Sequence, residues 1–321
     1  MSVGRVDPLA YSSLAMSATG EAIRPAENSA IGILWMLATM FFFISLDTMM
    51  KELLLTYSLV QVTWARFFFA TIIAAIAAGP RLPRIVRSQA PRLQLSRSLL
   101  LALTTGIFNA GIRLVPLATA TTIMFLSPIL VTALSVLLLK EQVGPRRWIG
   151  VGIGFLGALI VVRPWESDTD MFFLGAVLLL VAALFNANYQ IITRKVRLYD
   201  GPMTSLFYTA MAGAAVTSLL LPWSWEWPRA ADWLLLVGTG IAGGIGHLCL
   251  IQAFRHAPAS VVAPFSYSSL VWATLFGWLF FAEWPALTTW LGAVLIIGSG
   301  LYIFHRESQH GRNSRIRENM Q

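Results

Sequence analysis

Arg113-Leu-Val-Pro116 opens a stretch of sequence that returns later in the chain as Arg255-His-Ala-Pro258, at an offset of 255 − 113 = 142 residues. The same offset joins the later landmarks of the two copies, which follow an apolar segment of helix length: Lys140-Glu141 and Ala282-Glu283, then Trp148-Ile-Gly150 and Trp290-Leu-Gly292. Because no gap is needed across this run, chance similarity between apolar segments is a poor explanation. The chain is therefore interpreted as a duplication.

Composition indicates a membrane protein. Hydrophobic residues make up 57% of the 321 residues and charged residues 12%, whereas a soluble domain carries roughly 25% charged residues. The net charge of +8 does not favour nucleic acid as a partner, because the basic residues form short clusters between apolar segments, as at a membrane–water interface. Cys249 is a lone cysteine inside an apolar segment, so no disulfide framework is expected.

Residues 1–29 are polar, lack the features of a secretory signal and are expected to form a cytoplasmic tail. Ten apolar segments follow, each near the ~20 residues that cross a bilayer as a helix: 30–50, 58–78, 96–112, 117–139, 146–163, 171–193, 202–221, 232–254, 259–281 and 286–304. They divide into a first five-helix repeat (30–164) and a second (171–306), and a basic cytoplasmic tail (307–321) ends the chain.

Basic residues set the expected orientation. Lys and Arg fall mainly on the loops that share a side with the N-terminus, which places both termini in the cytoplasm. Five crossings are an odd number, so the two copies enter the membrane in opposite directions, with Glu141 inside and Glu283 outside. The sequence therefore predicts an all-α polytopic membrane protein with ten transmembrane helices in two inverted five-helix repeats. Such repeats are typical of secondary transporters.

Three ionisable side chains lie within the first two apolar segments. Asp47 and Lys51 are four residues apart, so they share one face of a helix near its outer end. Arg66 lies at a compatible depth in the next segment. Charges at the centre of a span cost ~2.5–3.5 kcal/mol, so each calls for a partner or a purpose. We expect either a structural ion pair between Asp47 and Arg66 or a gate or ligand role, and both interpretations predict a paired charge.

Further polar and aromatic side chains in the spans are candidates for substrate binding. Asn186, Tyr189 and Gln190 share one helix face, with Asn188 turned away, and form either a cavity wall or bonds to a neighbouring helix. His247 either carries a coupling proton or donates one hydrogen bond as a neutral ring. The remaining candidates are Phe125 and Tyr267, repeat-equivalent aromatics suited to stacking on a flat ring, with Trp272, Asn109 and Gln252.

Other features of the loops and helices have structural interpretations. Gly150 with Gly154 has the small-xxx-small spacing that lets helices approach closely, within one chain or between two copies. Glu141 and Glu283 lie at helix ends, where we expect capping and loop packing. The arginines from Arg81 to Arg97 are expected to anchor the chain at anionic lipid headgroups.

The first copy resembles the EamA-type unit of the drug/metabolite transporter superfamily through the following motifs: Pro116-Leu-Ala118, Phe125-Leu-Ser-Pro128, Leu137-Leu-Leu-Lys140-Glu141, Trp148-Ile-Gly150 and Gly157-Ala-Leu-Ile160. The second copy is similar but has Leu270 where the first has Pro128, and Trp284-Pro285 after its glutamate. The resemblance implies a ten-helix fold with a central cavity that moves a small organic metabolite across the cell inner membrane.

Two early motifs narrow the resemblance. Leu46-Asp47-Thr-Met-Met-Lys51 and Gln61-Val-Thr-Trp64-Ala-Arg66-Phe67 resemble the branch that takes up S-adenosylmethionine or riboflavin, and other similar members export amino acids and related metabolites. The resemblance therefore implies a secondary active transporter working by alternating access, with either a flat heterocycle as substrate or, as the alternative, export of amino acids.

Other classes of function are less consistent with the residues. The chain has four histidines, one cysteine and no His-Glu-x-x-His motif, so neither an enzyme nor a metal site is expected. No lysine follows a glycine, which argues against an ATP-driven pump, and no ring of charge indicates a channel. A non-transporting structural or sensor protein stays an alternative. The expected partners are a metabolite, membrane lipid and a coupling proton or ion, with no cofactor and no nucleic acid, in a monomer or homodimer.

Overall fold

The computed structural model describes residues 29–139, 145–165 and 170–318, and these ranges contain helices and loops but no strand. The expected N-terminal tail, Lys140 and Glu141 lie outside them. The elements are α2 (Ser29–Leu53), α3 (Leu59–Ala78), η1 (Gly79–Arg81), α4 (Leu82–Ile85), α5 (Pro91–Ile112), α6 (Leu117–Met124), α7 (Leu126–Leu139), α8 (Pro145–Val162), α9 (Asp170–Val196), α10 (Pro202–Leu220), η2 (Leu221–Trp223), α11 (Asp232–His256), α12 (Ala259–Val262), η3 (Ala263–Ser268), α13 (Ser269–Phe281) and α14 (Leu287–Glu318). The expected all-α class is confirmed.

Helices long enough to span a bilayer dominate the bundle. In the described part, eight helical stretches of 18 to 27 residues are long and apolar enough to cross a membrane. The apolar part of α8, Trp148–Val162, is shorter, and the segment expected at 259–281 is divided among α12, η3 and α13. Each expected segment falls on helix, while the number of ten crossings stays a prediction.

Local sequence sets the helix ends. α3 begins after Ser58, whose hydroxyl accepts the backbone N–H of Gln61 at 3.2 Å, an N-cap of the usual kind. It ends at Gly79, whose φ of 50° is a conformation that side chains disfavour. α5 and α10 each begin with proline at the first position, where its missing N–H costs no helical hydrogen bond.

The helices that start near the repeated proline are interrupted at equivalent positions. In the first copy Phe125 separates α6 from α7. In the second copy the interruption is the 3₁₀ segment η3, and it contains Tyr267, 142 residues after Phe125. Pro128 and Pro264 lie in or beside these breaks, and neither has an N–H to give to a helical hydrogen bond.

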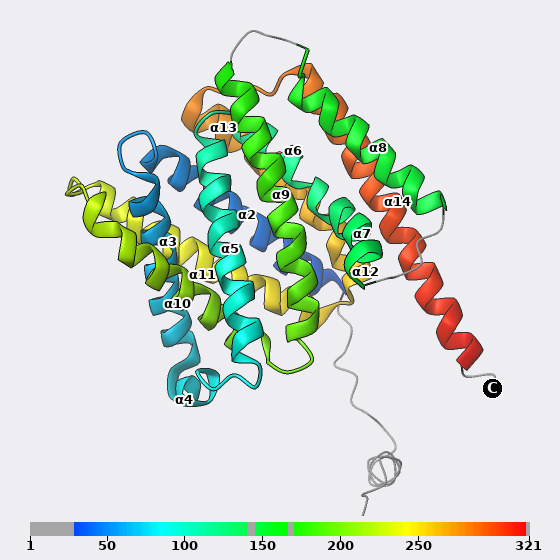
Figure 1. Ribbon diagram of the computed structural model, residues 1–321, viewed down its shortest axis with the longest axis horizontal. Coiled ribbons are helices and arrows are strands. Elements are labelled where there is room, and N and C mark those ends of the chain that lie inside the picture. Colours follow the sequence, from blue (N-terminus) through cyan, green and yellow to red (C-terminus); the bar gives the residue numbers. More distant parts are fainter. Residues whose placement is uncertain (1–28, 140–144, 166–169, 319–321) are drawn as a thin grey trace, which may run out of the picture.

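The last helices of the two copies, α8 and α14, pack side by side along a seam of small residues (Figure 1). A Cβ added at Gly157 would lie 2.9 Å from the carbonyl oxygen of Gly292, and one at Gly154 would lie 3.0 Å from the Ser299 hydroxyl. Since positions rise along α8 as they fall along α14, the two equivalent helices run antiparallel. This arrangement is what an inverted repeat requires.

A second pair of equivalent helices, α3 and α10, also pack on each other. The contact between α2 and α11 recurs in equivalent form between α9, the counterpart of α2, and α5, the counterpart of α11. One end of the bundle holds α13 and the other holds α4 (Figure 1). Lys51 bonds to Glu283 just after α13, and Asp200 bonds to Ser88 just after α4. These are called the Lys51 end and the Asp200 end.

Large apolar side chains cover the outside of the bundle. Ile76, Leu219 and Val294 are each about 70% exposed, at 71%, 73% and 69%. In water such a surface would be unfavourable, but a lipid-facing surface is expected to be apolar. With its membrane-length helices, the chain is a multi-pass membrane protein.

Candidate functional site

A cluster of polar side chains lies deep in the bundle, contributed by both repeats. Asp47 on α2 and Arg66 on α3 come from the first, and Tyr189 on α9 and His247 on α11 from the second. Arg66 lies within electrostatic range of Asp47, Tyr189 and His247, although no hydrogen bond or ion pair joins these four residues in the described part. All four side chains are partly exposed, although they belong to the middle or inner faces of long apolar helices. We call these four residues the central cluster.

The contacts of Arg66 differ from the pair that the sequence predicts. The ion pair found among the described residues joins Lys51 to Glu283, and none joins Asp47 to Arg66. The Arg66 guanidinium instead lies 4.0 Å from the Met50 sulfur and 5.6 Å from the centre of the Phe67 ring. Asp47 and Arg66 lie within electrostatic range of each other. They do not form an ion pair in this conformation.

Arg97 fixes the orientation of Tyr189. Its Nη2 donates to the Tyr189 hydroxyl at 2.7 Å, and its guanidinium lies 4.8 Å from the centre of the same ring. Its remaining donors reach Thr193 and Thr209 hydroxyls at 2.8 and 2.9 Å and the Ser205 carbonyl at 3.1 Å. Arg97 is 5% exposed, so its expected role as a lipid-headgroup anchor is wrong. It holds α5 to α9 and α10.

His247 is bonded within its own helix. Nδ1 lies 2.8 Å from the carbonyl oxygen of Gly243, and the ring packs edge-on against Phe43 with centroids 4.9 Å apart. A backbone carbonyl can only accept, so Nδ1 carries the hydrogen in this contact. The other ring nitrogen, Nε2, takes no part in it.

A polar network at the Asp200 end ties the turn after α9 to the residues that precede and begin α5. The Asp200 carboxylate accepts hydrogen bonds from the Ser88 hydroxyl at 2.5 Å, the Gln89 N–H at 2.9 Å and the Gln94 side-chain amide at 2.9 Å. Burial alone would raise the pKa of Asp200, but these hydrogen bonds outweigh it and hold the pKa below its ordinary value of 3.8. The turn after α9 is thereby tied to the start of α5.

The equivalent loops at the Lys51 end form a second network. Tyr57 donates to the Asp232 carboxylate at 2.5 Å, and Gln61 exchanges hydrogen bonds of 2.8 and 2.9 Å with the backbone of Glu226. Burial raises the pKa of the Tyr57 phenol, and its hydrogen bond to Asp232 raises it further. Each end of the bundle is thus tied by loops of both repeats.

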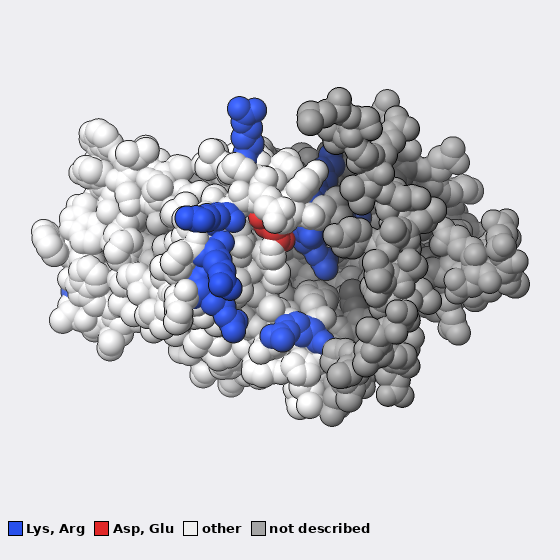
Figure 2. All heavy atoms as spheres, turned by 90° about the horizontal axis from the view of Figure 1, so that it is seen from below, with Lys and Arg blue, Asp and Glu red and all other residues white. Residues whose placement is uncertain are grey.

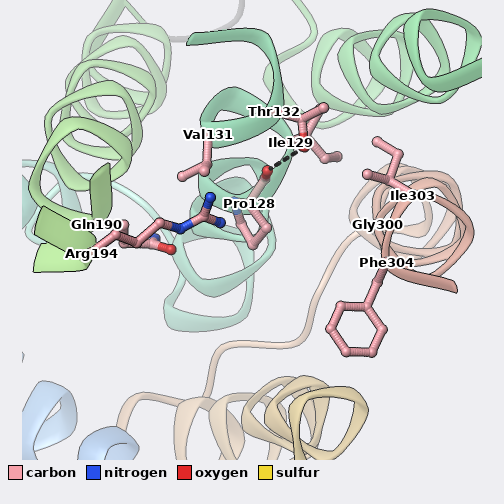
Figure 3. Close-up of a pocket in the computed structure, with 9 residues that line it drawn as sticks. All are labelled: Pro128, Ile129, Val131, Thr132, Gln190, Arg194, Gly300, Ile303 and Phe304. Carbon is pink, nitrogen blue, oxygen red and sulfur yellow. Dashed lines mark hydrogen bonds between the residues drawn. The ribbon is translucent and has the colours of Figure 1, made fainter. Parts of the chain in front are cut away.

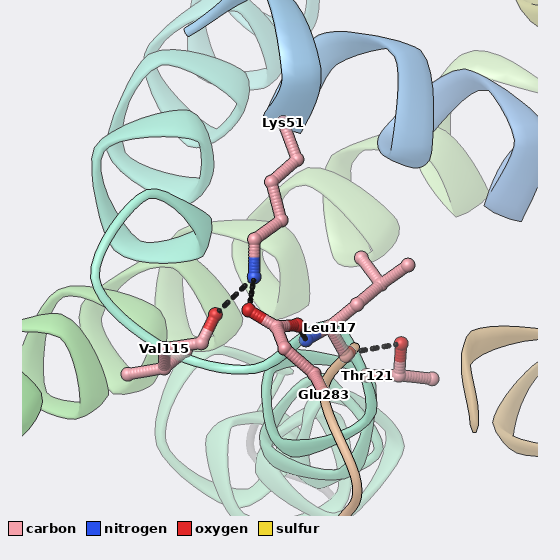
Figure 4. Close-up of polar contacts among 5 residues, drawn as sticks. All are labelled: Lys51, Val115, Leu117, Thr121 and Glu283. Carbon is pink, nitrogen blue, oxygen red and sulfur yellow. Dashed lines mark hydrogen bonds and ion pairs between the residues drawn. The ribbon is translucent and has the colours of Figure 1, made fainter. Parts of the chain in front are cut away.

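Lys51 forms the ion pair that joins the repeats at its end (Figure 4). Its Nζ donates to Glu283 Oε1 at 2.5 Å and to the Val115 carbonyl at 2.8 Å, and Glu283 Oε2 accepts the Leu117 N–H at 3.1 Å. Leu117 is the first residue of α6, so the carboxylate caps that helix, as expected of Glu283. The preceding Ala282 is left-handed, with φ 53°, which turns the chain out of α13.

A pocket of about 150 Å³ lies toward the Asp200 end, between α7, α9 and α14 (Figure 3). Gln190 and Arg194 of α9 point toward Pro128 on α7, and Gly300, Ile303 and Phe304 of α14 form the opposite wall. Gly300 also packs against the Tyr267 hydroxyl. The break that holds Tyr267 therefore contacts the α14 wall of the pocket.

Most of the other candidate residues contact a neighbouring helix, whereas Gln252 contacts Arg255 on its own helix, α11. The Phe125 and Tyr267 rings meet edge-to-face at 4.9 Å, which joins the two breaks. Trp272 packs on Phe41 with centroids 5.1 Å apart. The remaining contacts are Asn186 to the Ser127 hydroxyl at 3.2 Å, Asn109 to the Thr63 hydroxyl at 2.9 Å, and Gln252 to Arg255 at 3.4 Å.

Two residues of these networks were not predicted from the sequence. The run of arginines from Arg81 places Arg97 in a surface cluster, whereas its position just inside an apolar segment is the signal that indicates burial. The sequence predicts capping by Glu283 but not its partner Lys51, which lies 232 positions away in the chain. In the described part, no group of three His, Cys, Asp or Glu side chains is placed to hold a metal ion.

A multi-pass bundle of two inverted repeats, with interrupted helices and polar residues of both halves at its centre, defines the class of secondary-transporter-like membrane proteins. The chain belongs to the EamA-like transporter family, whose model matches residues 30–163 and 173–304. The two matches coincide with the two copies of the repeat.

Relatives with known names support the same class. The chain is 30% identical over 291 residues to a riboflavin transporter of Vibrio cholerae, covering 88% of this chain and 96% of that protein. It is 28% identical over 278 residues to an S-adenosylmethionine uptake transporter of Rickettsia felis, covering 87% and 94%, and 28% identical over 270 residues to a pseudopaline exporter of Pseudomonas aeruginosa, covering 83% and 93%. The family and these relatives identify a metabolite transporter.

Proposed function

We propose that the chain is a secondary active transporter that moves a small organic metabolite by alternating access between its two repeats. The observation that carries this proposal is the central cluster. Asp47, Arg66, Tyr189 and His247 come from four helices of both repeats, and each keeps a partly exposed side chain at depth. Ionisable groups within membrane spans usually face a cavity or a pathway. A site between inverted repeats is open to each side in turn as one half rocks against the other.

The two ends of the bundle differ in a way that supports this mechanism. At the Lys51 end, the Lys51–Glu283 ion pair joins the repeats. Toward the Asp200 end, a pocket enters between α7, α9 and α14. We infer that the conformation described is closed at the first end and open at the second. The opposite conformation requires Lys51 and Glu283 to separate and α14 to approach α9.

We further propose that the protein lies in the cell inner membrane with both termini in the cytoplasm. Viewed from the Asp200 end, Lys and Arg side chains gather over the middle of the face (Figure 2). The positive-inside rule then assigns this face to the cytoplasm. In that orientation the pocket opens inward.

For the substrate, a flat heterocyclic metabolite is the first candidate. Relatives named as riboflavin and S-adenosylmethionine transporters match the chain over nearly its whole length, and the Phe125–Tyr267 pair offers aromatic surface beside the pocket. Export is the alternative, because a relative named as an exporter matches over a similar length. A coupling proton on His247 and a homodimeric assembly remain part of the proposal.

Counterflow in proteoliposomes tests the proposal. Proteoliposomes that contain the purified protein would be loaded with unlabelled riboflavin, S-adenosylmethionine or a mixture of the twenty amino acids. Entry of the same solute in labelled form would then be followed. We expect saturable exchange for one of these solutes and its loss in Tyr189→Ala, because that side chain belongs to the central cluster. Arg113→Gln, an exposed arginine at the end of α5, is the matched control. Absence of saturable exchange for every solute would contradict a transport function.

A further inference from the structure

The pocket between α7, α9 and α14 is open at positions whose repeat counterparts are packed. The offset relates Pro128 to Leu270, since 128 + 142 = 270. Pro128 is exposed, whereas Leu270 is 7% exposed. The same offset relates Gln190, which is partly exposed, to Thr48, which is 6% exposed. At these positions one copy of the repeat leaves a space that the other copy fills with side chains.

Arg194 brings a positive charge into this pocket. Arg194 and Gln190 lie one turn apart on α9, and both side chains point toward Pro128 (Figure 3). In the part of the chain that the structure describes, neither forms a hydrogen bond or an ion pair. No acidic residue lines the pocket. Since a guanidinium has five N–H donors and an amide has two, the pocket offers donors and a charge without an anion to receive them.

The remaining wall of the pocket is mainly apolar. Ile303 and Phe304 of α14 lie opposite α9 (Figure 3). Surroundings of low dielectric strengthen the attraction between a guanidinium and an anion. The volume of about 150 Å³ exceeds the roughly 10–15 Å³ that one water needs, so a polyatomic anion has room. A guanidinium suits phosphate in particular, because its fork donates two parallel hydrogen bonds to phosphate oxygens.

The place of the pocket in the bundle also favours phosphate. Arg194 lies in the last turn of α9, at the end of a membrane-length helix. Basic pockets between membrane-spanning helices are a recognised setting for phosphate headgroups. Lys and Arg side chains gather on this face of the molecule (Figure 2), and such a field attracts anions. A phospholipid headgroup and a free phosphate in solution share the chemistry that the pocket would bind.

We propose that this pocket is a binding site for a phosphate group, held by the guanidinium of Arg194 and the side-chain amide of Gln190. Its occupation has a consequence that rests on the proposed transport function. The opposite conformation requires α14 to approach α9, and a group bound between these helices prevents that approach. The bound phosphate therefore holds the bundle open at the Asp200 end and slows exchange.

Thermal unfolding of the full-length protein tests the site with two probes. Inorganic phosphate would be added in detergent, with sodium chloride of equal ionic strength as the reference. Nanodiscs of phosphatidylcholine would be compared with nanodiscs that also contain phosphatidylglycerol. We expect a higher melting temperature, because a ligand stabilises the state that it binds. A shift with inorganic phosphate identifies a free anion as the source, and a shift with phosphatidylglycerol alone identifies a lipid.

Three variants assign the shift to the pocket. In Arg194→Gln the Kd for the effective probe should rise roughly 10- to 100-fold, the range expected on losing a hydrogen bond to a charged group. Arg194→Lys keeps the charge but not the fork, and should recover part of the affinity. Arg197→Gln is the matched control, because Arg197 is exposed, follows the end of α9 and does not line the pocket.

Two results would overturn the site. One is a melting temperature that neither probe changes in the unaltered protein. The other is an equal loss of the shift in Arg194→Gln and Arg197→Gln, which would assign it to general surface charge.

Counterflow tests the consequence for transport separately. At a probe concentration equal to its Kd, half of the protein is held in one conformation, so exchange should fall by about half. Arg194→Gln should relieve this inhibition. Exchange that the bound probe leaves unchanged would overturn the conformational role and leave the site. Absence of exchange for every solute, with the Arg194-dependent shift retained, would overturn the transport function and leave the site.

Discussion

Charged side chains within this bundle are stabilised in different ways. Lys51 has a carboxylate and a backbone carbonyl within hydrogen-bond distance, Arg97 has neutral oxygens around it, and Arg66 has weak partners. A charge in a low-dielectric medium without partners is costly. The differences therefore separate Lys51 and Arg97, which join helices through strong hydrogen bonds, from Arg66, whose contact with the neighbouring helix in the described part is a weak one to sulfur.

At the residue scale, Lys51 and Glu283 are expected to be thermodynamically coupled. Lys51→Met leaves the carboxylate without its cation, and Glu283→Gln leaves the ammonium without its anion. The Glu283 side chain is 25% exposed, so we expect each change to cost about 1–3 kcal/mol rather than the larger loss seen for fully buried pairs. Thermal unfolding in detergent measures both losses.

The double variant provides the decisive comparison for this pair. Since its two changes remove one interaction, Lys51→Met with Glu283→Gln should lose less stability than the sum of the single variants. Losses that add within about 0.3–0.5 kcal/mol would mean that the two residues act independently.

At the element scale, the α8–α14 seam depends on the absence of side chains. Gly157 and Gly292 approach backbone to backbone, and the Ile296 side chain lies 2.9 Å from a Cβ added at Gly157. Without a hydrophobic driving force between helices in lipid, close packing of this kind is a main source of association. The seam is therefore the fixed contact between the last helices of the two repeats.

Gly157→Leu should destabilise this seam. The larger side chain would push α8 from α14, and overpacking of this kind costs about 1–3 kcal/mol. Gly152→Leu is the matched control on the same helix, because nothing lies within 4 Å of a Cβ added there. A lower melting temperature for Gly157→Leu alone is expected in detergent. Equal losses for both variants would assign the effect to helix composition rather than to the seam.

The positions of the helices follow from the sequence more directly than their contacts do. The offset of 142 residues between landmarks predicts the two repeats, and apolar length predicts the spans, because both are properties of neighbouring residues. The partner of Lys51 is not such a property. Asp47 lies four residues away and Glu283 lies 232 away, and only the packing of α13 against α2 and α6 selects the distant one.

The central cluster is an intermediate case. Polarity within apolar segments identified Asp47, Arg66, Tyr189 and His247 as candidates, and all four lie deep in the bundle. The role of Arg97 did not follow, because a basic residue near a helix end has the same sequence signature whether it faces lipid headgroups or two neighbouring helices. Its 5% exposure is a consequence of tertiary packing.

At the scale of the whole molecule, inverted repeats place equivalent residues on opposite faces of the membrane. Arg84 and Glu226 are separated by 226 − 84 = 142 positions, and both are exposed. Arg84 lies in α4 at the Asp200 end, and Glu226 lies in the loop that contacts Gln61 at the Lys51 end. The side of the membrane from which each of these two positions can be reached therefore indicates how the two copies are oriented.

Labelling of single cysteines tests this topology. In a Cys249→Ala background, Glu226→Cys should react with a membrane-impermeant thiol reagent on intact cells. Arg84→Cys should react only after the membrane is made permeable. Modification of both positions from the same side would contradict the inverted arrangement. Reaction of Arg84→Cys alone on intact cells would reverse the orientation proposed here while preserving the inversion.

The Lys51–Glu283 ion pair also bears on how tightly the unoccupied protein seals the membrane. Separating a cation from its anion in surroundings of low dielectric requires work, and an empty carrier has no solute to supply it. In the proposed mechanism the unoccupied protein is therefore held closed on that face, so that protons and metal ions have no continuous route across. A cell that stores energy as an electrochemical gradient could carry many copies of such a protein without draining it.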